Sequence, residues 1–188
     1  MTLLLTRNEL EKVLDAQSVI QAVEQGCAEY SAGKAQVPIR TSLHGQDMPG
    51  TLLVMPCAMG ETHVLGTKFA GVYPNNPARG LSTIEALYVL FDYETGASLA
   101  IMDANFMTGI RTAAASAVAT RHLAREDATT LGIFGTGTQA EYHALLIPLV
   151  RPIKQIVIQG SSPEKALAFV ERMKARLTVK ISAARSLE

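Results

Sequence analysis

The residues with the clearest chemical meaning form a glycine-rich turn. Gly135, Gly137 and Ala140 fit the pattern G-x-G-x-x-A, directly after the apolar run LGIF and at the start of a helical pattern. In this context the first glycine permits a tight turn, the second leaves room for a pyrophosphate, and the alanine lets the helix approach the strand. Thr138 adds a hydroxyl donor beside the amides of the helix N-terminus. The turn therefore predicts dinucleotide binding, with an ordinary strand-to-helix turn as the alternative.

The residues that select the dinucleotide are expected about 20 positions further on, where a carboxylate binds the ribose 2′-hydroxyl of NAD. The sequence there is QGSS, residues 159–162, and contains no acid. Ser161 and Ser162 are able to donate to a 2′-phosphate, but no arginine stands beside them. The cofactor is therefore NAD(H) or NADP(H), and the sequence does not choose between them.

Three cationic side chains lie in segments that are otherwise apolar or rich in small residues. Arg40 stands in VPIRTSL, Lys68 in HVLGTKFAGV, and Arg111 directly before an alanine-rich run. A guanidinium binds a carboxylate through two parallel N–H groups, and a desolvated ammonium is able to transfer a proton. Taken alone, Arg40 and Lys68 are more simply interpreted as solvent-facing charges. We expect Arg111 in the first turn of a helix over 108–124, where its charge opposes the helix dipole.

The hydrophobic pattern divides the chain into two parts. Residues 1–124 begin with a helical pattern, with a capping-box spacing between Thr6 and Glu9, and continue with short apolar runs that include a strand over 37–43. Residues 125–188 then alternate between strands and helices, at 131–134, 141–150, 155–159, 163–177 and 178–182. This alternation is typical of a parallel sheet. The predicted fold class is α+β followed by an α/β Rossmann-type sheet, of which only the first half is present, so we expect a truncated chain.

The composition argues against several classes of protein. Seventeen basic and seventeen acidic residues give a formal charge of +0, which provides no field for nucleic acid. Cys27 and Cys57 do not form a C-x-x-C pair, which favours a reducing compartment, and the four histidines lack the spacing of metal ligands. No apolar run reaches the length of a membrane span. We therefore expect a cytoplasmic protein without a metal site, a membrane partner or a nucleic-acid partner.

Several segments, in order along the chain, resemble the ornithine cyclodeaminase and mu-crystallin family. They are VPIRTSL, LLVMP, GTKFAGVYPNNPARGLST, DYETGASLAIMDANFMTGIRTAAASAVATRHLA and GIFGTGTQA. The resemblance implies a domain over residues 1–124 that binds substrate and forms a homodimer, and a partial NAD(P)-binding domain over 125–188. It also implies hydride exchange at the α-carbon of a small amino acid or cyclic imino acid, by a cyclodeaminase or by a ketimine or pyrroline-carboxylate reductase.

The family's pattern implies roles for individual residues of this chain. Arg40, Lys68 and Arg111 are expected to bind the substrate, with Lys68 also catalytic. The expected cofactor-binding residues are Thr83, Arg111, Gly135, Gly137, Thr138 and Gln139, to which the local sequence adds Thr112 and Ser161. The family's catalytic aspartate would follow the end of this chain. The sequence therefore leaves open an enzyme, a non-catalytic NADP-binding protein like the mu-crystallins, or an inactive truncated fragment.

Overall fold

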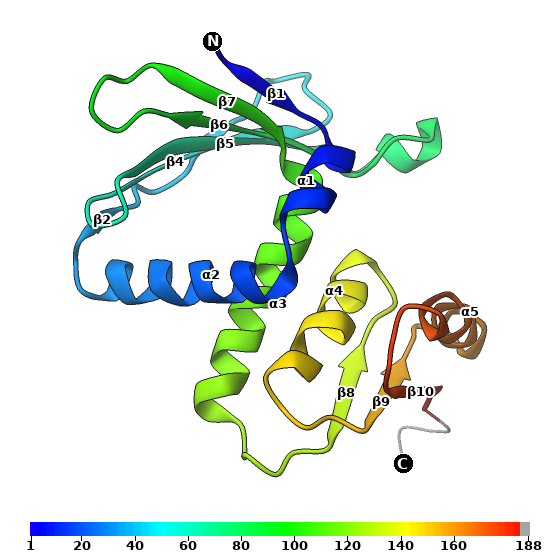
Figure 1. Cartoon of the computed structure of the whole chain (residues 1–188). Coiled ribbons are helices and arrows are strands. Elements are labelled where there is room, and N and C mark those ends of the chain that lie inside the picture. Colours follow the sequence, from blue (N-terminus) through cyan, green and yellow to red (C-terminus); the bar gives the residue numbers. More distant parts are fainter. Residues whose placement is uncertain (185–188) are drawn as a thin grey trace. The chain divides into compact units, whose positions relative to one another are not determined.

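The computed structural model describes residues 1–184 and divides the chain into two compact units (Figure 1). The first comprises Met1–Asp15 and Gln25–Thr108, and the second comprises Ala16–Glu24 and Gly109–Glu188. This division by contacts differs from the boundary predicted at residues 124/125. The reason is that two continuous helices, α2 (Ala16–Ser31) and α3 (Ala104–Leu123), each contribute residues to both units.

The first unit is built on a seven-stranded, mainly antiparallel sheet. Its long strands β4 (Thr51–Met59), β5 (Val64–Val72), β6 (Ile84–Phe91) and β7 (Ser98–Asp103) form consecutive antiparallel pairs. Three short strands complete it, namely β1 (Leu3–Leu5), β2 (Ala35–Gln36) and β3 (Thr41–Leu43). The strand order is β1-β7-β6-β5-β4-β2, with β3 paired to β4 and β1 parallel to β7.

The start of helix α3 packs on one face of this sheet. Ala70 and Ala86 oppose each other on β5 and β6, and both pack with Ala104 at the start of α3 in a small core. Residues two apart along a strand share a face, so Lys68 and Tyr88 lie on this same face. The covered face is therefore the one that carries the predicted substrate lysine.

The opposite face of the sheet exposes large apolar side chains. Phe69 and Leu87 oppose each other there and are 36% and 53% exposed. Leu4 on β1 lies on this face as well and is 72% exposed. We call Leu4, Phe69 and Leu87 the outer apolar face.

The helices of the first unit begin at side-chain caps. The predicted capping box of α1 (Arg7–Val13) is confirmed, because the Thr6 N–H donates to Glu9 Oε2 at 2.8 Å. Helix α3 begins four residues earlier than predicted, since Asp103 Oδ1 accepts the N–H of Phe106 at 3.0 Å and caps the helix there. Arg111 therefore lies about two turns into the helix. Its predicted place in the first turn, opposing the helix dipole, is wrong.

The second unit contains the predicted alternation of strands and helices. In chain order these are β8 (Thr130–Phe134), α4 (Thr138–Leu146), the 3₁₀ turn η2 (Ile147–Leu149), β9 (Gln155–Gln159), α5 (Pro163–Lys174) and β10 (Lys180–Ala183). The strands are parallel in the order β10-β9-β8. Ile156, Ile158, Phe169 and Met173 are fully buried at the centre of the unit's core. The unit is an incomplete Rossmann-type sheet, as predicted.

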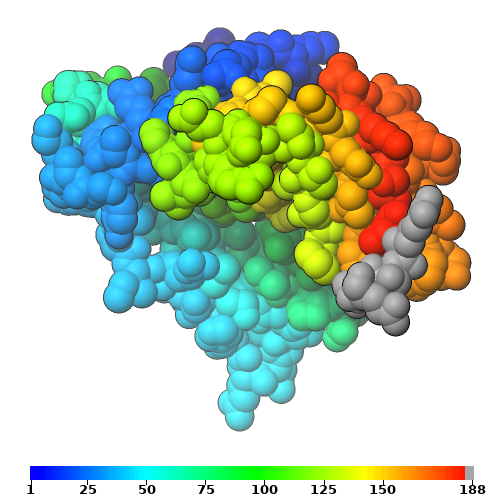
Figure 2. All heavy atoms as spheres, turned by 90° about the horizontal axis from the view of Figure 1, so that it is seen from below, coloured from blue at the N-terminus to red at the C-terminus, as the bar shows by residue number. Residues whose placement is uncertain are grey.

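The connection between β3 and β4 is the most prominent projection of the first unit. It is the cyan segment around residue 50 in Figure 2, and residues 41–47 leading into it are exposed.

In the part of the chain that the structure describes, no helix combines the length and the apolar character needed to cross a bilayer.

Candidate functional site: a glycine-rich turn and three cations

The glycine-rich turn connects β8 to α4 in the second unit. Gly135 has a φ of 112°, in a region that favours glycine, and its N–H donates to the carbonyl of Gln159 at the end of β9 at 2.8 Å. Gly137 has extended backbone and is the N-cap of α4. A Cβ on either glycine would meet no atom within 4 Å. The outer side of the turn is therefore open to a ligand.

The residues after the turn complete a site that fits an anion. Ala140 is 7% exposed and belongs to the core together with Ile156 and Ile158 of β9, so α4 lies close to the sheet as predicted. Thr138 and Gln139 are exposed in the first turn of α4, where backbone N–H groups have no acceptor within the helix. Free amides at a helix N-terminus bind phosphate oxygens. These residues therefore fit the pyrophosphate of a dinucleotide.

Helix α3 packs directly against α4 and fixes the position of Arg111 within the unit. A Cβ on Gly109 would lie 2.2 Å from the ring of Tyr142, so this ring rests on the α3 backbone. Further along, His143 Nε2 lies 2.8 Å from the Ser116 hydroxyl. Arg111 lies between these two contacts on α3 and is exposed. It has no hydrogen bond or ion pair with any residue in 1–184.

Lys68 lies in the middle of β5 in the first unit, opposite Met55 on β4 and Tyr88 on β6, and is half-buried. Burial raises the pKa of Tyr88, and the neighbouring Cys57 adds to this. Burial also raises the pKa of the Cys57 thiol, with a smaller contribution from the charge of Glu29. Both groups are therefore neutral at pH 7, and neither of them supplies an anion to Lys68.

Arg40 lies directly before β3, and the strand predicted over 37–43 extends only over Thr41–Leu43. Thr41 pairs with Val54 on β4, and the next residue of β4, Met55, pairs with Lys68. Arg40 and Lys68 are therefore two strand spacings apart, about 10 Å at the backbone. Arg40 is exposed and makes no hydrogen bond or ion pair within the described chain.

The remaining predicted site residues lie in both units. Thr83 ends the loop before β6 and is exposed, and its carbonyl accepts the N–H of Tyr73 at 2.8 Å. Thr112 follows Arg111 on α3 and is half-buried, and Ser161 follows β9 and is exposed. The structure places Arg40, Lys68 and Thr83 in the first unit and the other predicted residues in the second. That these residues surround one ligand stays a prediction.

One charged residue near the turn, Lys165, was not predicted from the sequence. Lys165 Nζ donates to the hydroxyl of Ser161 at 3.2 Å, which places an ammonium beside the end of β9. The sequence signal for this pair is its spacing of four residues. Ser161 lies just before α5 and Lys165 in its first turn, so the two side chains lie on the same side of the helix N-terminus. Lys165 lies on α5, outside the loop residues 159–162 in which a partner for a 2′-phosphate is expected.

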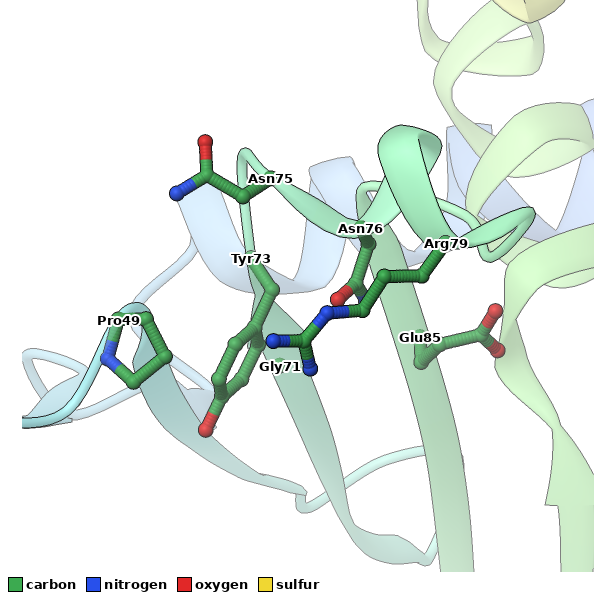
Figure 3. A pocket seen from close by; sticks show the side chains of 7 residues that line it. All are labelled: Pro49, Gly71, Tyr73, Asn75, Asn76, Arg79 and Glu85. Atoms are coloured by element: carbon green, nitrogen blue, oxygen red, sulfur yellow. The ribbon is translucent and has the colours of Figure 1, made fainter.

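The first unit also contains a cavity of about 350 Å³. It is lined by Pro49, Gly71, Tyr73, Asn75, Asn76, Arg79 and Glu85, where the 3₁₀ helix η1 (Asn76–Arg79) follows β5 (Figure 3). The ring of Tyr73 is seated against Gly50, where a Cβ would lie 2.6 Å from ring carbons. Gly71 and Glu85 oppose each other on the sheet face that does not carry Lys68. None of the predicted site residues lines this cavity.

Comparison with known proteins places the chain in a family. The model of the ornithine cyclodeaminase/mu-crystallin family matches residues 1–188. The chain belongs to this family. A Δ1-pyrroline-2-carboxylate reductase of Bacillus cereus is 38% identical over 169 residues, which are 90% of this chain and 52% of the relative. An alanine dehydrogenase of Archaeoglobus fulgidus is 36% identical over 170 residues, 90% of this chain and 51% of the relative.

Solved structures share the fold of this ornithine cyclodeaminase/mu-crystallin family chain. A Thermococcus litoralis Δ1-pyrroline-2-carboxylate reductase in complex with NADH and L-proline superposes with a TM-score of 0.92 and 38% identity. That match covers 99% of this chain and 58% of the other. An archaeal alanine dehydrogenase dimer with bound NAD has a TM-score of 0.89 and 33% identity, over 97% of this chain and 56% of the other. The chain thus spans about half the length of the relatives it matches.

Proposed function

We propose that the protein carrying this chain is an NAD(P)-dependent oxidoreductase that exchanges a hydride with the α-carbon of a small amino acid or cyclic imino acid. Within this class, reduction of a cyclic ketimine acid such as Δ1-pyrroline-2-carboxylate has the most support, because relatives with that name are 38% identical in sequence. The structural observation that carries the proposal is the open turn at Gly135 and Gly137 beside the end of β9.

The proposed cofactor site follows the turn. Gly135, Gly137, Thr138 and Gln139 are assigned to the pyrophosphate, and Ser161 to the adenosine ribose. On the family resemblance, Thr83 and Arg111 are assigned to the nicotinamide end, and on the local sequence Thr112, which follows Arg111, is assigned with them. A bound nicotinamide supplies or accepts the hydride at the substrate carbon.

The proposed substrate groups are the three cations. Arg40 and Arg111 have no partner among the described residues, and a guanidinium binds a carboxylate through two parallel N–H groups. Lys68 adds a half-buried ammonium beside the neutral Cys57 and Tyr88. Reduction of the imine adds a hydride to carbon and a proton to nitrogen, and we assign Lys68 to proton transfer.

We also propose that the protein is a homodimer formed through the outer apolar face. Leu4 and Leu87 are more than half exposed on this face, and a second copy would remove them from water. A relative with 33% identity is described as a dimer. The free cysteines Cys27 and Cys57 favour a cytoplasmic location.

The test measures the oxidation of NADH and NADPH by the change in their absorbance. The substrates are Δ1-pyrroline-2-carboxylate and larger cyclic ketimine acids. We expect Arg40→Met to raise KM at least about tenfold, because it removes two charge-assisted hydrogen bonds to the carboxylate. Arg79→Met is the matched control, since Arg79 is also exposed and lacks a partner in residues 1–184, and it should leave KM unchanged. Dinucleotide binding without turnover of any such substrate would contradict the proposal and favour a binding protein.

A further inference from the structure

The loop after β9 is the part of the turn region that determines which dinucleotide binds. The hydrogen bond from the Gly135 N–H to the Gln159 carbonyl places the end of β9 against the glycine-rich turn. A dinucleotide held at such a turn lays its adenosine ribose over the end of this second strand. Gly160 keeps the loop close to α5, because a Cβ there would lie 2.9 Å from the Ala166 nitrogen.

This loop lacks the group that selects NAD. A carboxylate at the end of the second strand binds the ribose 2′-hydroxyl and repels a 2′-phosphate. Residues 159–162 contain no acid. The first acidic side chain is Glu164 in the opening turn of α5, and its carboxylate is hydrogen-bonded to the side chain of Ser162. Glu164 is exposed, so its charge opposes an added phosphate only through water.

The loop instead presents donors and a positive charge. Lys165 Nζ donates to Ser161 Oγ at 3.2 Å, and apart from this bond neither side chain has a partner among residues 1–184. An ammonium has three N–H groups and a hydroxyl has one O–H, so two N–H groups and the serine proton remain available. Both side chains are exposed beside the proposed ribose position.

We propose that Ser161 and Lys165 bind a 2′-phosphate, so that the protein prefers NADP(H) to NAD(H). This inference rests on the proposed function, because it assumes that the dinucleotide binds at the glycine-rich turn. The phosphate carries close to two negative charges at pH 7 and has three acceptor oxygens, which match the ammonium and the hydroxyl. The paired Lys165 and Ser161 replace the arginine that other 2′-phosphate sites contain.

The experiment isolates the 2′-phosphate by calorimetric titration of the full chain with two nucleotides that differ only in that group. Adenosine 2′,5′-bisphosphate should bind about tenfold more tightly than adenosine 5′-monophosphate, and NADPH should show the same advantage over NADH. Lys165→Met should reduce this ratio to near one while leaving the monophosphate affinity unchanged. Glu164→Gln should increase it, because one opposing charge is removed.

Two further variants separate the site from general charge. Lys174→Met removes an ammonium from the other end of α5, where Lys174 pairs with Glu171, and should not change the ratio. Ser161→Asp should reverse the preference toward the monophosphate and NADH. Equal binding of the two nucleotides by the unmodified chain, or a Lys165→Met ratio that does not fall, would overturn the inference. Failure of all four nucleotides to bind would overturn the proposed function itself and the preference with it.

Discussion

The substitution Gly137→Ser separates the stability of the turn from its function. Gly137 is the N-cap of α4 with extended backbone, a conformation that serine adopts readily. A Cβ there would meet no atom within 4 Å, so the added carbon fits without any movement of the protein. It would nevertheless occupy the space in which the pyrophosphate approaches the turn.

The two expected effects have opposite signs. Serine is a better N-cap than glycine and restricts the unfolded chain, so the free energy of unfolding should rise by about 0.5 kcal/mol. In a chain of this length that raises Tm by about 1–2 °C. Loss of one or two hydrogen bonds to the pyrophosphate, each worth about 1.5–3 kcal/mol, should weaken dinucleotide binding at least about tenfold.

The assay pairs thermal unfolding with calorimetric titration of NADPH and NADH. Gly135→Ala provides the contrast, since its φ of 112° makes any side chain strained even though the space is open. That variant should lower the free energy of unfolding by about 1–3 kcal/mol. A clearly lower unfolding temperature for Gly137→Ser, or dinucleotide binding as tight as that of the unmodified chain, would refute these expectations.

Three further predictions concern packing, pH and assembly. Gly109→Ala should destabilise the second unit by about 1–3 kcal/mol in urea unfolding, because the new Cβ would lie 2.2 Å from the Tyr142 ring. Adding Tyr142→Leu should recover part of this loss of stability, and no recovery would mean that the clash with Tyr142 is not its cause. The hydrogen bond with His122, followed by the charge of Arg121, lowers the pKa of Glu24 below its ordinary value of 4.5. This carboxylate therefore contributes stability above pH 4.5 that is lost as the pH falls through its folded pKa. Glu24→Gln should therefore reduce the fall in the free energy of unfolding at acid pH, and an unchanged fall would be evidence against the pairing. Leu87→Glu should convert the proposed dimer to a monomer in light scattering, whereas a persistent dimer would place the interface elsewhere.

Elements stabilised by local interactions were predictable from the sequence. The strand at 155–159 was predicted with its observed bounds, because its apolar run lies between polar residues and packs into a core made by its own neighbours. Strand β1 was missed, since its three residues are held by pairing with β7, almost one hundred positions away. The early start of α3 was missed because the cap is a single aspartate inside a strand pattern, Asp103.

The candidate site shows the same division. The roles of Gly135 and Ala140 follow from local spacing, and the structure shows the positive φ and the close helix packing that the spacing requires. The expected strand environment of Arg40 was wrong, because β3 is limited by its pairing with β4. Lys165 was missed because its contact with Ser161 depends on where α5 begins.

The most direct measurement is a crystal structure of the protein with NADPH and L-proline bound. We expect the pyrophosphate on the amides around Gly137, and the proline carboxylate within about 3 Å of the guanidinium groups of Arg40 and Arg111 and of Lys68 Nζ. A dinucleotide bound away from the turn, or a carboxylate that contacts none of these three cations, would contradict the account.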